Sequence, residues 1–199
     1  ITSNENYYMV YDPNSDRDRK EDHLYLTGTG EHSLVPMHSN EILDFKNLPI
    51  KYAAFSTCFR REAGSYGKDT KGILRVHQFD KIEMVEFVKP EDDERERRKM
   101  LSIVEELMQS LGLTYRVVML STEDLAFPTA ETVDIETWIP SQGIYRETHS
   151  ISTTTDFQAR RFNIRYRDGK DKKFVHILNG TAFAIGRTII AIMENYQQK

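Results

Sequence analysis

The chain has 199 residues, a formal net charge of −4 and 39% hydrophobic residues, which is enough to bury the core of one soluble domain spanning residues 1–199. Its single cysteine can form neither an internal disulfide nor a cysteine-rich zinc cluster, so we expect no zinc and a reducing, cytoplasmic location. The polar N-terminus and the lack of any run of roughly 20 apolar residues argue against a signal peptide and a membrane span, and the mild acidity argues against nonspecific coating of nucleic acid.

The N-terminal part of the chain predicts short strands and one helix start. Residues 7–11 form an aromatic and apolar run typical of a strand, and the charged residues 12–22 predict a solvated loop. Residues 23–38 predict a strand, a Thr/Gly turn and a helix that starts near Glu31. On its own, a glycine turn followed by a carboxylate is an ordinary capped turn.

Residues 51–87 predict a long antiparallel hairpin. Residues 52–59 form the first extended run and residues 73–87 the second, with a polar loop that contains glycines over residues 62–71. Alternation along the second strand places five side chains on one face: Arg75, His77, Phe79, Lys81 and Glu83. A guanidinium, an aromatic ring and a carboxylate in line suit a ligand with a phosphate, a flat ring and an amine or hydroxyl. Arg60 adds a second positive charge beside this row, although a charged, solvated hairpin is the simpler alternative.

Residues 90–111 predict an amphipathic helix whose apolar positions follow helical spacing: Met100, Val104, Leu107, Met108 and Leu111. Gly112 is well placed to end this helix, and its charged first turns, residues 91–99, are expected to form a solvated face. A short apolar strand is predicted for residues 115–120.

A second hairpin is predicted from residues 132–139 and 145–152, joined by a turn at residues 140–143. Val133 and Ile135 share one face of its first strand. Its second strand is mostly polar, which indicates either an exposed edge or a polar ligand or metal alongside.

The C-terminal part predicts an arginine-rich loop at residues 155–167, a hairpin turn at residues 168–173, and a strand, an Asn-Gly turn and a helix over residues 174–197. The arginines of the loop are expected to have a structural role, although contact with a phosphate backbone stays open. Arg187 is at odds with its apolar helix, because a buried arginine needs an anionic partner such as a carboxylate or a nucleotide phosphate.

Residues 58–83, CFRREAGSYGKDTKGILRVHQFDKIE, closely resemble the second signature motif of class II aminoacyl-tRNA synthetases in its seryl-type form. Thr29-Gly30-Glu31 resembles the Thr-x-Glu amino-acid-binding motif of that family, in which the middle residue is often alanine. Residues 145–152 and 174–197 resemble two further family segments, so the resemblance covers residues 23–197. It implies an α+β fold, an antiparallel sheet flanked by helices.

The resemblance also implies an activity: serine-tRNA ligase chemistry, in which ATP with Mg²⁺ activates L-serine to seryl-adenylate and the serine passes to tRNA(Ser). Two alternatives stay open. One is a relative that loads an amino acid onto a carrier protein, but its usual zinc ligands include cysteines and this chain has only Cys58. The other is a non-catalytic paralogue, which would be favoured by the loss of Arg60, Glu83 or Arg187, all of which are present.

Two family features have no match in this chain. No first class II motif, which builds the dimer interface, lies upstream of His23, and the N-terminal helical arm that grips tRNA is missing. We therefore expect a partial catalytic core whose full-length protein is a homodimer, with no membrane partner.

The resemblance assigns site residues by matched position. The catalytic residues would be Arg60, Arg75 and Arg187. The ATP-binding residues would be Arg60, Arg61, Glu62, Arg75, Val76, Phe79, Glu147, Thr148, His149, Ser150 and Arg187. The serine-binding residues would be Thr29, Gly30, Glu31, Glu83, Asn179 and Thr181.

Within this set, Arg60 would hold the α-phosphate, Arg75 and Arg187 the outer phosphates, Phe79 would stack on adenine, and Glu62 would read its amino edge. Glu147 and Ser150 would take Mg²⁺ through ATP. These two residues have opposite strand parity, so they can share a face only if the strand bends or bulges.

Overall fold

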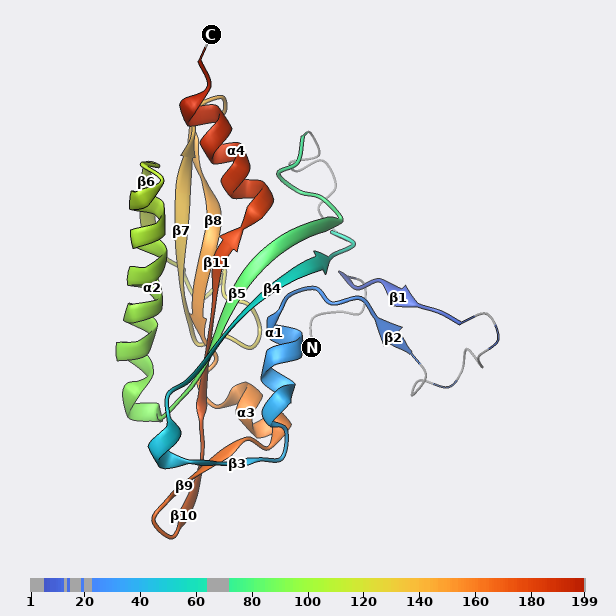
Figure 1. Ribbon diagram of the computed structural model, residues 1–199, viewed down its shortest axis with the longest axis vertical. Coiled ribbons are helices and arrows are strands. Elements are labelled where there is room, and N and C mark those ends of the chain that lie inside the picture. The colour runs from blue at the N-terminus through green and yellow to red at the C-terminus, as the bar shows by residue number, and fades with distance from the viewer. Residues whose placement is uncertain (1–5, 13, 15–18, 20–22, 64–71, 199) are drawn as a thin grey trace.

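A computed structural model describes residues 6–12, 14, 19, 23–63 and 72–198 of the chain. Its centre is a six-stranded sheet in which every pair of neighbours is antiparallel. In spatial order the strands are β4 (Ile50–Phe59), β5 (Gln78–Val88), β11 (His176–Ala184), β8 (Ile144–Thr153), β7 (Glu131–Ile139) and β6 (Tyr115–Met119). The sheet is twisted, since β4 and β5 cross Figure 1 diagonally whereas β7 and β8 run almost vertically.

Two long helices, α2 (Asp93–Ser110) and α4 (Ile185–Tyr196), cover one face of the sheet. Met100, Val104 and Met108 of α2 are buried, as their spacing predicted, against Leu178 and Ile151. The helix ends at Ser110, where Gly112 takes a positive φ of 62°. No helix in the described ranges is long and apolar enough to cross a membrane.

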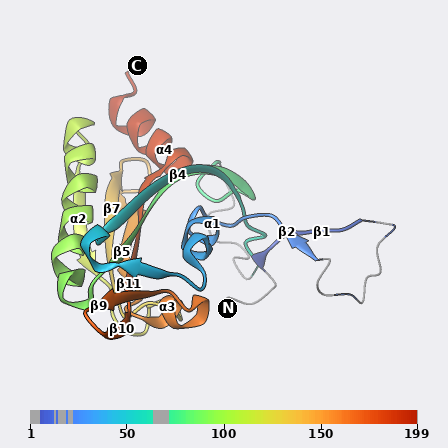
Figure 2. The same ribbon diagram turned by 60° about the horizontal axis from the view of Figure 1, so that its bottom comes forward.

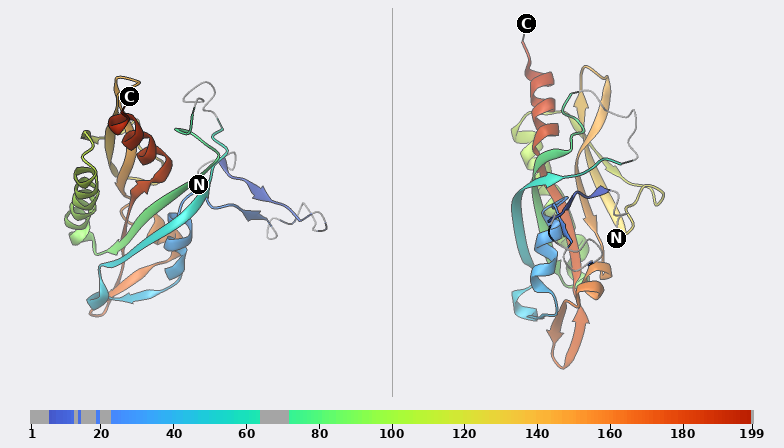
Figure 3. Two further views of the ribbon diagram at one scale, coloured as in Figure 1. Left: turned by 45° about the horizontal axis from the view of Figure 1, so that its top comes forward. Right: turned by 90° about the vertical axis from the view of Figure 1, so that its right-hand side faces the viewer.

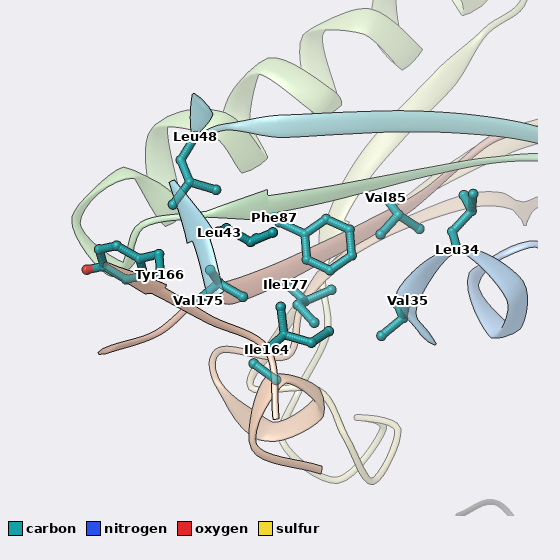
Figure 4. Close-up of a cluster of buried hydrophobic side chains, with 11 residues drawn as sticks. Leu34, Val35, Leu43, Leu48, Val85, Phe87, Ile164, Tyr166, Val175 and Ile177 are labelled. Atoms are coloured by element: carbon teal, nitrogen blue, oxygen red, sulfur yellow. The ribbon is translucent and has the colours of Figure 1, made fainter. Parts of the chain in front are cut away.

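The opposite face of the sheet is covered by short elements, and Figure 2 shows them on the far side of the strands from α2. They are α1 (Glu31–Leu34), η3 (Val35–His38), η4 (Phe45–Asn47), α3 (Phe157–Phe162) and a small sheet of β3 (Ile42–Asp44), β9 (Arg165–Asp168) and β10 (Asp171–Phe174). The short helix η5 (Pro90–Asp92) leads from β5 into α2. Figure 4 shows the core on this side, where Val85 and Phe87 pack with Leu34 and Ile177. A separate hairpin of β1 (Met9–Val10) and β2 (Leu24–Tyr25) projects away from the main sheet in the left view of Figure 3.

The two cores fix which side chains share a face. Along β5, Val85 and Phe87 belong to the core under α1, so Phe79, Lys81 and Glu83 point to that same side. On β11, Ile177 lies in the core under α1 whereas Leu178 lies in the core under α2. We call the side with α1 the site face.

The α+β expectation is confirmed, and four local predictions are corrected. The predicted Asn-Gly turn does not form, because Asn179 and Gly180 lie inside β11, where both pair with β5 and β8. The predicted arginine-rich loop of residues 155–167 contains α3 and most of β9.

The second strand of the central hairpin begins at Gln78, not at residue 73, because the ladder ends at the Phe59–Gln78 pair. Arg75 and His77 therefore lie outside the strand. The charged start of α2 is a solvated face only in part: Glu94, Arg95, Arg98 and Lys99 are exposed, whereas Glu96 is only 1% exposed.

Candidate functional site

The centre of the site face holds a buried ion pair on β5. Lys81 and Glu83 lie two residues apart on one face of the strand, and Lys81 Nζ is 2.5 Å from Glu83 Oε2. Both residues are more than nine-tenths buried. Burial raises the pKa of the Glu83 carboxyl, and the Lys81 charge opposes that rise. Sequence analysis placed Lys81 on the same strand face as Glu83 but gave it no role. The spacing of two residues between this lysine and this glutamate could have indicated the ion pair.

β11 adds two polar side chains next to this pair. Thr181 is directly opposite Glu83 in the antiparallel register, and its hydroxyl donates to Glu83 Oε2 at 3.4 Å. Asn179 lies two residues earlier on the same face of β11. The structure therefore brings Glu83, Asn179 and Thr181 together, as the matched positions suggested.

Glu31 reaches this group from α1. Its Oε1 accepts hydrogen bonds from Asn179 Nδ2 at 2.8 Å and from Gln158 Nε2 of α3 at 2.5 Å. Gln158 was not anticipated, because nothing local to its own segment indicates a partner 127 residues away. The nearby Thr29 is buried, and its hydroxyl has no hydrogen-bond partner in the protein. A buried hydroxyl without a partner is costly, which favours a ligand atom opposite it.

Gly30, just before α1, lies close to the sheet. A Cβ at this position would lie 3.2 Å from Ala54 Cβ and 3.3 Å from Glu83 Cβ. These contacts are tighter than ordinary van der Waals distances, so the small residue lets the start of α1 sit directly over Glu83. This packing is the structural reason for a small middle residue between Thr29 and Glu31.

Arg60 and Phe79 meet at the end of the central hairpin. Arg60 follows β4 directly; its Nε donates to the carbonyl of Gly28 at 3.0 Å, and its guanidinium lies 5.3 Å from the centre of the Phe79 ring. This is within cation–π distance. The two residues expected to hold a phosphate and an adenine are therefore neighbours, on the same face of β5 as Glu83.

Arg75 and Glu62 form an ion pair with each other beyond the end of the hairpin. Glu62 takes a positive φ of 51°, and Arg75 Nε is buried without a partner. Arg61 has an exposed side chain, and its backbone N–H donates to Asn6, whereas Val76 is half-buried. Arg75 thus lies in a turn and not on a strand face. The expected loop of residues 62–71 lies mostly outside the described residues.

A β-bulge on β8 places Glu147 and Ser150 on one face, although their spacing along the strand gives them opposite parity. Asp134 pairs with Ser150 and Ile135 with His149, but Glu136 pairs with Glu147, so Thr148 is the extra residue. Since Asp134 and Glu136 share one face of β7, Ser150 and Glu147 share that same face of β8. Ile135 and Ile151 belong to the core under α2, which puts these four polar residues on the site face.

Arg187 of α4 lies at the edge of this polar group. Its Nη1 donates to the carbonyl of Glu147 at 2.8 Å and is 3.4 Å from Glu147 Oε2. The anionic partner that the sequence demanded for this arginine is thus a protein carboxylate. The geometry also permits a nucleotide phosphate beside Arg187, because the Glu147 side chain is 51% exposed and can contact another ligand at the same time.

Asp134 lies on the site face, although sequence analysis did not single it out. It is 7% exposed, and its Oδ1 has no hydrogen-bond partner. Burial, together with the nearby Glu147 and Glu136 charges, raises its pKa to about 6. The signal available in the sequence was its alternation with Glu136, but the bulge that aligns both with Glu147 could not be read from it.

Thr148 and His149 lie on the other face of β8. The Thr148 hydroxyl shares hydrogen bonds with Thr137 Oγ1 and the Ile135 carbonyl, and the His149 ring packs against Phe183. Burial lowers the pKa of His149 to about 4, so the ring is neutral at pH 7. Their side chains therefore do not line the site, and any contact they make with a nucleotide must come from the backbone.

The site face thus presents two arrays on adjacent strands. One array holds Glu83, Thr181 and Glu31, which suit the amine and hydroxyl of a small amino acid. The other consists of oxygen donors, namely Asp134, Glu136, Glu147 and Ser150, which suit a hard cation such as Mg²⁺. Within the described ranges, no three His, Cys, Asp or Glu side chains converge closely enough to hold a metal ion by themselves.

Comparisons with known proteins identify the family of the chain. Residues 8–196 match the family model of the tRNA synthetase class II core domain (G, H, P, S and T). The serine–tRNA ligase of Nautilia profundicola is 54% identical over 176 residues, which are 88% of this chain and 42% of that protein. The serine–tRNA ligase of Sulfurihydrogenibium sp. is 54% identical over 180 residues, 90% of this chain and 43% of that protein. The chain spans less than half the length of these curated relatives.

Solved structures are similar as well. The seryl-tRNA synthetase from Pyrococcus horikoshii complexed with ATP superposes with a TM-score of 0.89 at 48% identity, over 98% of this chain and 42% of that one. The cytoplasmic serine–tRNA ligase from Naegleria fowleri in complex with AMP gives a TM-score of 0.88 at 39% identity, over 98% and 44%. With its family model matched over almost its whole length and its sheet superposed on these structures, the chain belongs to the class II tRNA synthetase core-domain family.

Proposed function

We propose that this chain is the catalytic core of a serine-tRNA ligase, which activates L-serine with ATP and passes the serine to tRNA(Ser). One observation carries the proposal: Glu83, paired with Lys81 and opposite Thr181, shares a strand face with Phe79 beneath Arg60. Phe79 and Glu83 are four residues apart, roughly 14 Å along the strand at about 3.4 Å per residue. A ligand with adenine at one end and an amino acid at the other can bridge that distance.

In the activation step, an oxygen of the serine carboxylate attacks the α-phosphorus of ATP. The bond from that phosphorus to the bridging oxygen of the β-phosphate breaks, and pyrophosphate leaves with the electron pair. Arg60 would offset charge on the α-phosphate, while Arg75 and Arg187 would hold the outer phosphates. Charge-assisted hydrogen bonds of this kind contribute about 1.5–3 kcal/mol each. No covalent protein nucleophile is needed, so catalysis rests on positioning and electrostatics.

In the transfer step, a terminal ribose hydroxyl of tRNA attacks the seryl carbonyl carbon. The bond from that carbon to the phosphate oxygen breaks, AMP leaves with the electron pair, and the hydroxyl proton passes to the departing phosphate. Glu83 and Thr181 would hold the seryl group in place through its polar atoms. A buried set of hydrogen-bonding groups that matches the serine hydroxyl penalises alanine, which would leave those groups unpaired.

Mg²⁺ fits the oxygen donors of Glu147 and Ser150, with Asp134 Oδ1 nearby and unpartnered. Bound there through ATP, the ion would neutralise phosphate charge during the displacement. A single cysteine supports a site without zinc. Cytoplasmic location and a homodimeric full-length protein complete the proposal.

The test is amino-acid-dependent exchange of pyrophosphate into ATP, with serine compared with alanine, threonine and glycine. We expect exchange with serine alone and none with Arg60→Ala. Exchange with another amino acid would overturn the serine assignment. If this chain gives no exchange, calorimetry with a non-hydrolysable seryl-adenylate analogue, seryl-sulfamoyl adenosine, decides: binding weakened by Arg60→Ala supports the site, and no binding rejects it.

A further inference from the structure

Asn6 lies shortly before β1 and contacts the turn that follows β4. Its carbonyl accepts a hydrogen bond from the Arg61 N–H at 3.0 Å, and its Oδ1 accepts one from the Ala63 N–H at 3.2 Å. Glu62, between these two donors, takes a positive φ of 51°. Such a conformation is uncommon for a residue with a Cβ and persists where the surroundings stabilise it. The two hydrogen bonds to Asn6 flank Glu62 and provide this stabilisation.

The position of this turn decides where the Glu62 carboxylate lies. Its Oε2 forms an ion pair with Arg75, whose Nε is buried and has no hydrogen-bond partner among the described residues. The Glu62 side chain is only 18% exposed. Under the proposed function, Glu62 reads the amino edge of adenine while Arg75 holds an outer phosphate. A displaced turn would therefore alter the recognition of the base together with the pairing of Arg75.

Tyr8 braces the other arm of the same loop. Its hydroxyl is hydrogen-bonded to His77 Nδ1, and the rings of the two residues lie 6.1 Å apart. The His77 carbonyl in turn accepts a hydrogen bond from the Arg60 N–H at 3.0 Å. Figure 1 shows the start of β1 beside the ends of β4 and β5. One short segment therefore contacts both arms of the hairpin at the point where the ladder between its strands has ended.

We propose that Asn6 is a positioning residue for adenine recognition, because it holds the turn that presents the Glu62 carboxylate to the amino group of the base. The inference rests on the proposed function and deepens it, since it gives a residue outside the main sheet a part in nucleotide selectivity. Asn6 acts through the backbone of residues 61–63 and not by contact with the nucleotide. An amino group donates to a carboxylate, whereas a carbonyl oxygen at the same place on the base is repelled by it.

The test compares ATP with inosine triphosphate, in which a carbonyl oxygen replaces the adenine amino group. Calorimetry with Mg²⁺ and without serine measures both affinities. We expect the unaltered chain to prefer ATP about tenfold and Asn6→Ala to reduce this preference about fivefold, as the loss of one hydrogen bond allows. Asn6→Asp keeps an oxygen acceptor for the Ala63 N–H and should restore the preference.

Three results would overturn the inference: no preference for ATP in the unaltered chain, an unchanged preference in Asn6→Ala, or an equal loss in Asn6→Asp. A fall of both affinities by the same factor leaves the preference unchanged and counts against it in the same way. Met9→Ala is the control, because it truncates a side chain of β1 that is 49% exposed. It should leave the preference for ATP as it is.

Amide hydrogen exchange of the ligand-free chain separates this inference from the proposed function. The Ala63 N–H should exchange about fivefold faster in Asn6→Ala than in the unaltered chain, and at its original rate in Asn6→Asp. The Ile177 N–H, which donates to the Thr155 carbonyl, should keep its rate in both variants and so report an intact fold. If the unaltered chain does not bind ATP, the proposed function fails, while an unchanged exchange rate at Ala63 shows that Asn6 does not hold the turn.

Discussion

Strand β5 carries two buried glutamates, Glu86 on the face under α2 and Glu83 on the site face, and their surroundings differ. On the face under α2, Lys51 contacts both Glu86 at 3.1 Å and Glu96 at 2.6 Å, and Glu96 also contacts Arg95 and Lys99. On the site face, Glu83 has Lys81 and the Thr181 hydroxyl. We call the first group the α2 network.

Burial raises the pKa of Glu86 as it does that of Glu83, so the difference between the two groups lies in Glu96 of α2. Burial raises the pKa of Glu96, but hydrogen bonds from Lys51, Lys99 and Arg95 together lower it to about 2. The pKa of Glu83 is instead raised, because burial outweighs the ion pair with Lys81 and the more distant charge of Arg60. A carboxylate with three cationic partners stabilises the fold, whereas one with a single cation retains capacity for a substrate amine or hydroxyl.

The largest expected effect is on stability, from Glu96→Gln. Removing the charge leaves Lys51, Arg95 and Lys99 without their shared partner, and we expect the free energy of unfolding to fall by about 3 kcal/mol. Urea denaturation measures this. Glu94→Gln is the matched control, because its pair with Arg98 on the same helix is mostly exposed and is worth about 0.5 kcal/mol or less. Equal losses for the two variants would contradict the comparison.

The pH dependence of stability follows from the same carboxylate. Because the folded-state pKa of Glu96 lies below its unfolded value of 4.5, its contribution is present above about pH 4.5 and is lost as the pH falls toward 2. A shift of this size corresponds to about 3 kcal/mol. We expect Glu96→Gln to flatten that part of the stability–pH curve, measured by urea melts between pH 2 and 6. An unchanged slope would show that other carboxylates cause the acid lability.

On the site face, Lys81→Met should act on ligand affinity. Without its ammonium, burial raises the pKa of Glu83 further, which favours the neutral carboxyl, a weaker acceptor that no longer offers a negative charge to the serine ammonium. We expect affinity for seryl-sulfamoyl adenosine to fall about 30-fold at pH 7, or about 2 kcal/mol. The loss should shrink as the pH rises and Glu83 ionises, and calorimetry at several pH values would detect this.

Lys51→Met is the control for that experiment. It removes a lysine from the same sheet, but from the α2 network, so it should lower stability and leave analogue affinity within about twofold. Similar losses of affinity in both variants would mean that Lys81 supports the fold generally and does not position Glu83.

The smallest expected effect is that of Thr181→Val. The hydroxyl donates to Glu83 at 3.4 Å, a long hydrogen bond, and valine keeps the shape. We expect about a fivefold loss of affinity for the seryl analogue and almost none for the corresponding alanyl analogue, near 1 kcal/mol of discrimination. Equal losses for the two analogues would place Thr181 outside the contact with the serine hydroxyl.

Local patterns predicted much of the fold. The 3.6-residue spacing of Met100, Val104 and Met108 identified α2, and alternation identified β7 and most of the central hairpin. The second strand was extended too far, because Leu74 and Val76 continue its apolar alternation. The paired ladder ends at Phe59–Gln78, and beyond it the Arg60 N–H still donates to the His77 carbonyl.

The residues of the candidate site were harder to predict from local sequence patterns. The resemblance named Glu83, Thr181 and Arg60, but not Lys81, whose role follows from a contact across one strand face. Glu96 was assigned to a solvated face because its partner Lys51 is 45 residues away, and charge pattern alone does not show which carboxylate faces the sheet. Asp134 was missed for a similar reason, since its alignment with Glu147 depends on a bulge.

That bulge at Thr148 also limits how β8 can change in length. Between the turn and Thr148, side chains alternate between the two faces in one phase, and beyond Thr148 they alternate in the opposite phase. Inserting or deleting one residue in the turn at residues 140–143 would leave Glu147 and Ser150 on a common face. The same change between Thr148 and Ser150 would turn one of them toward α2. Length variation that preserves the site is therefore confined to the hairpin end, which makes that turn the place to attach a label or an added segment.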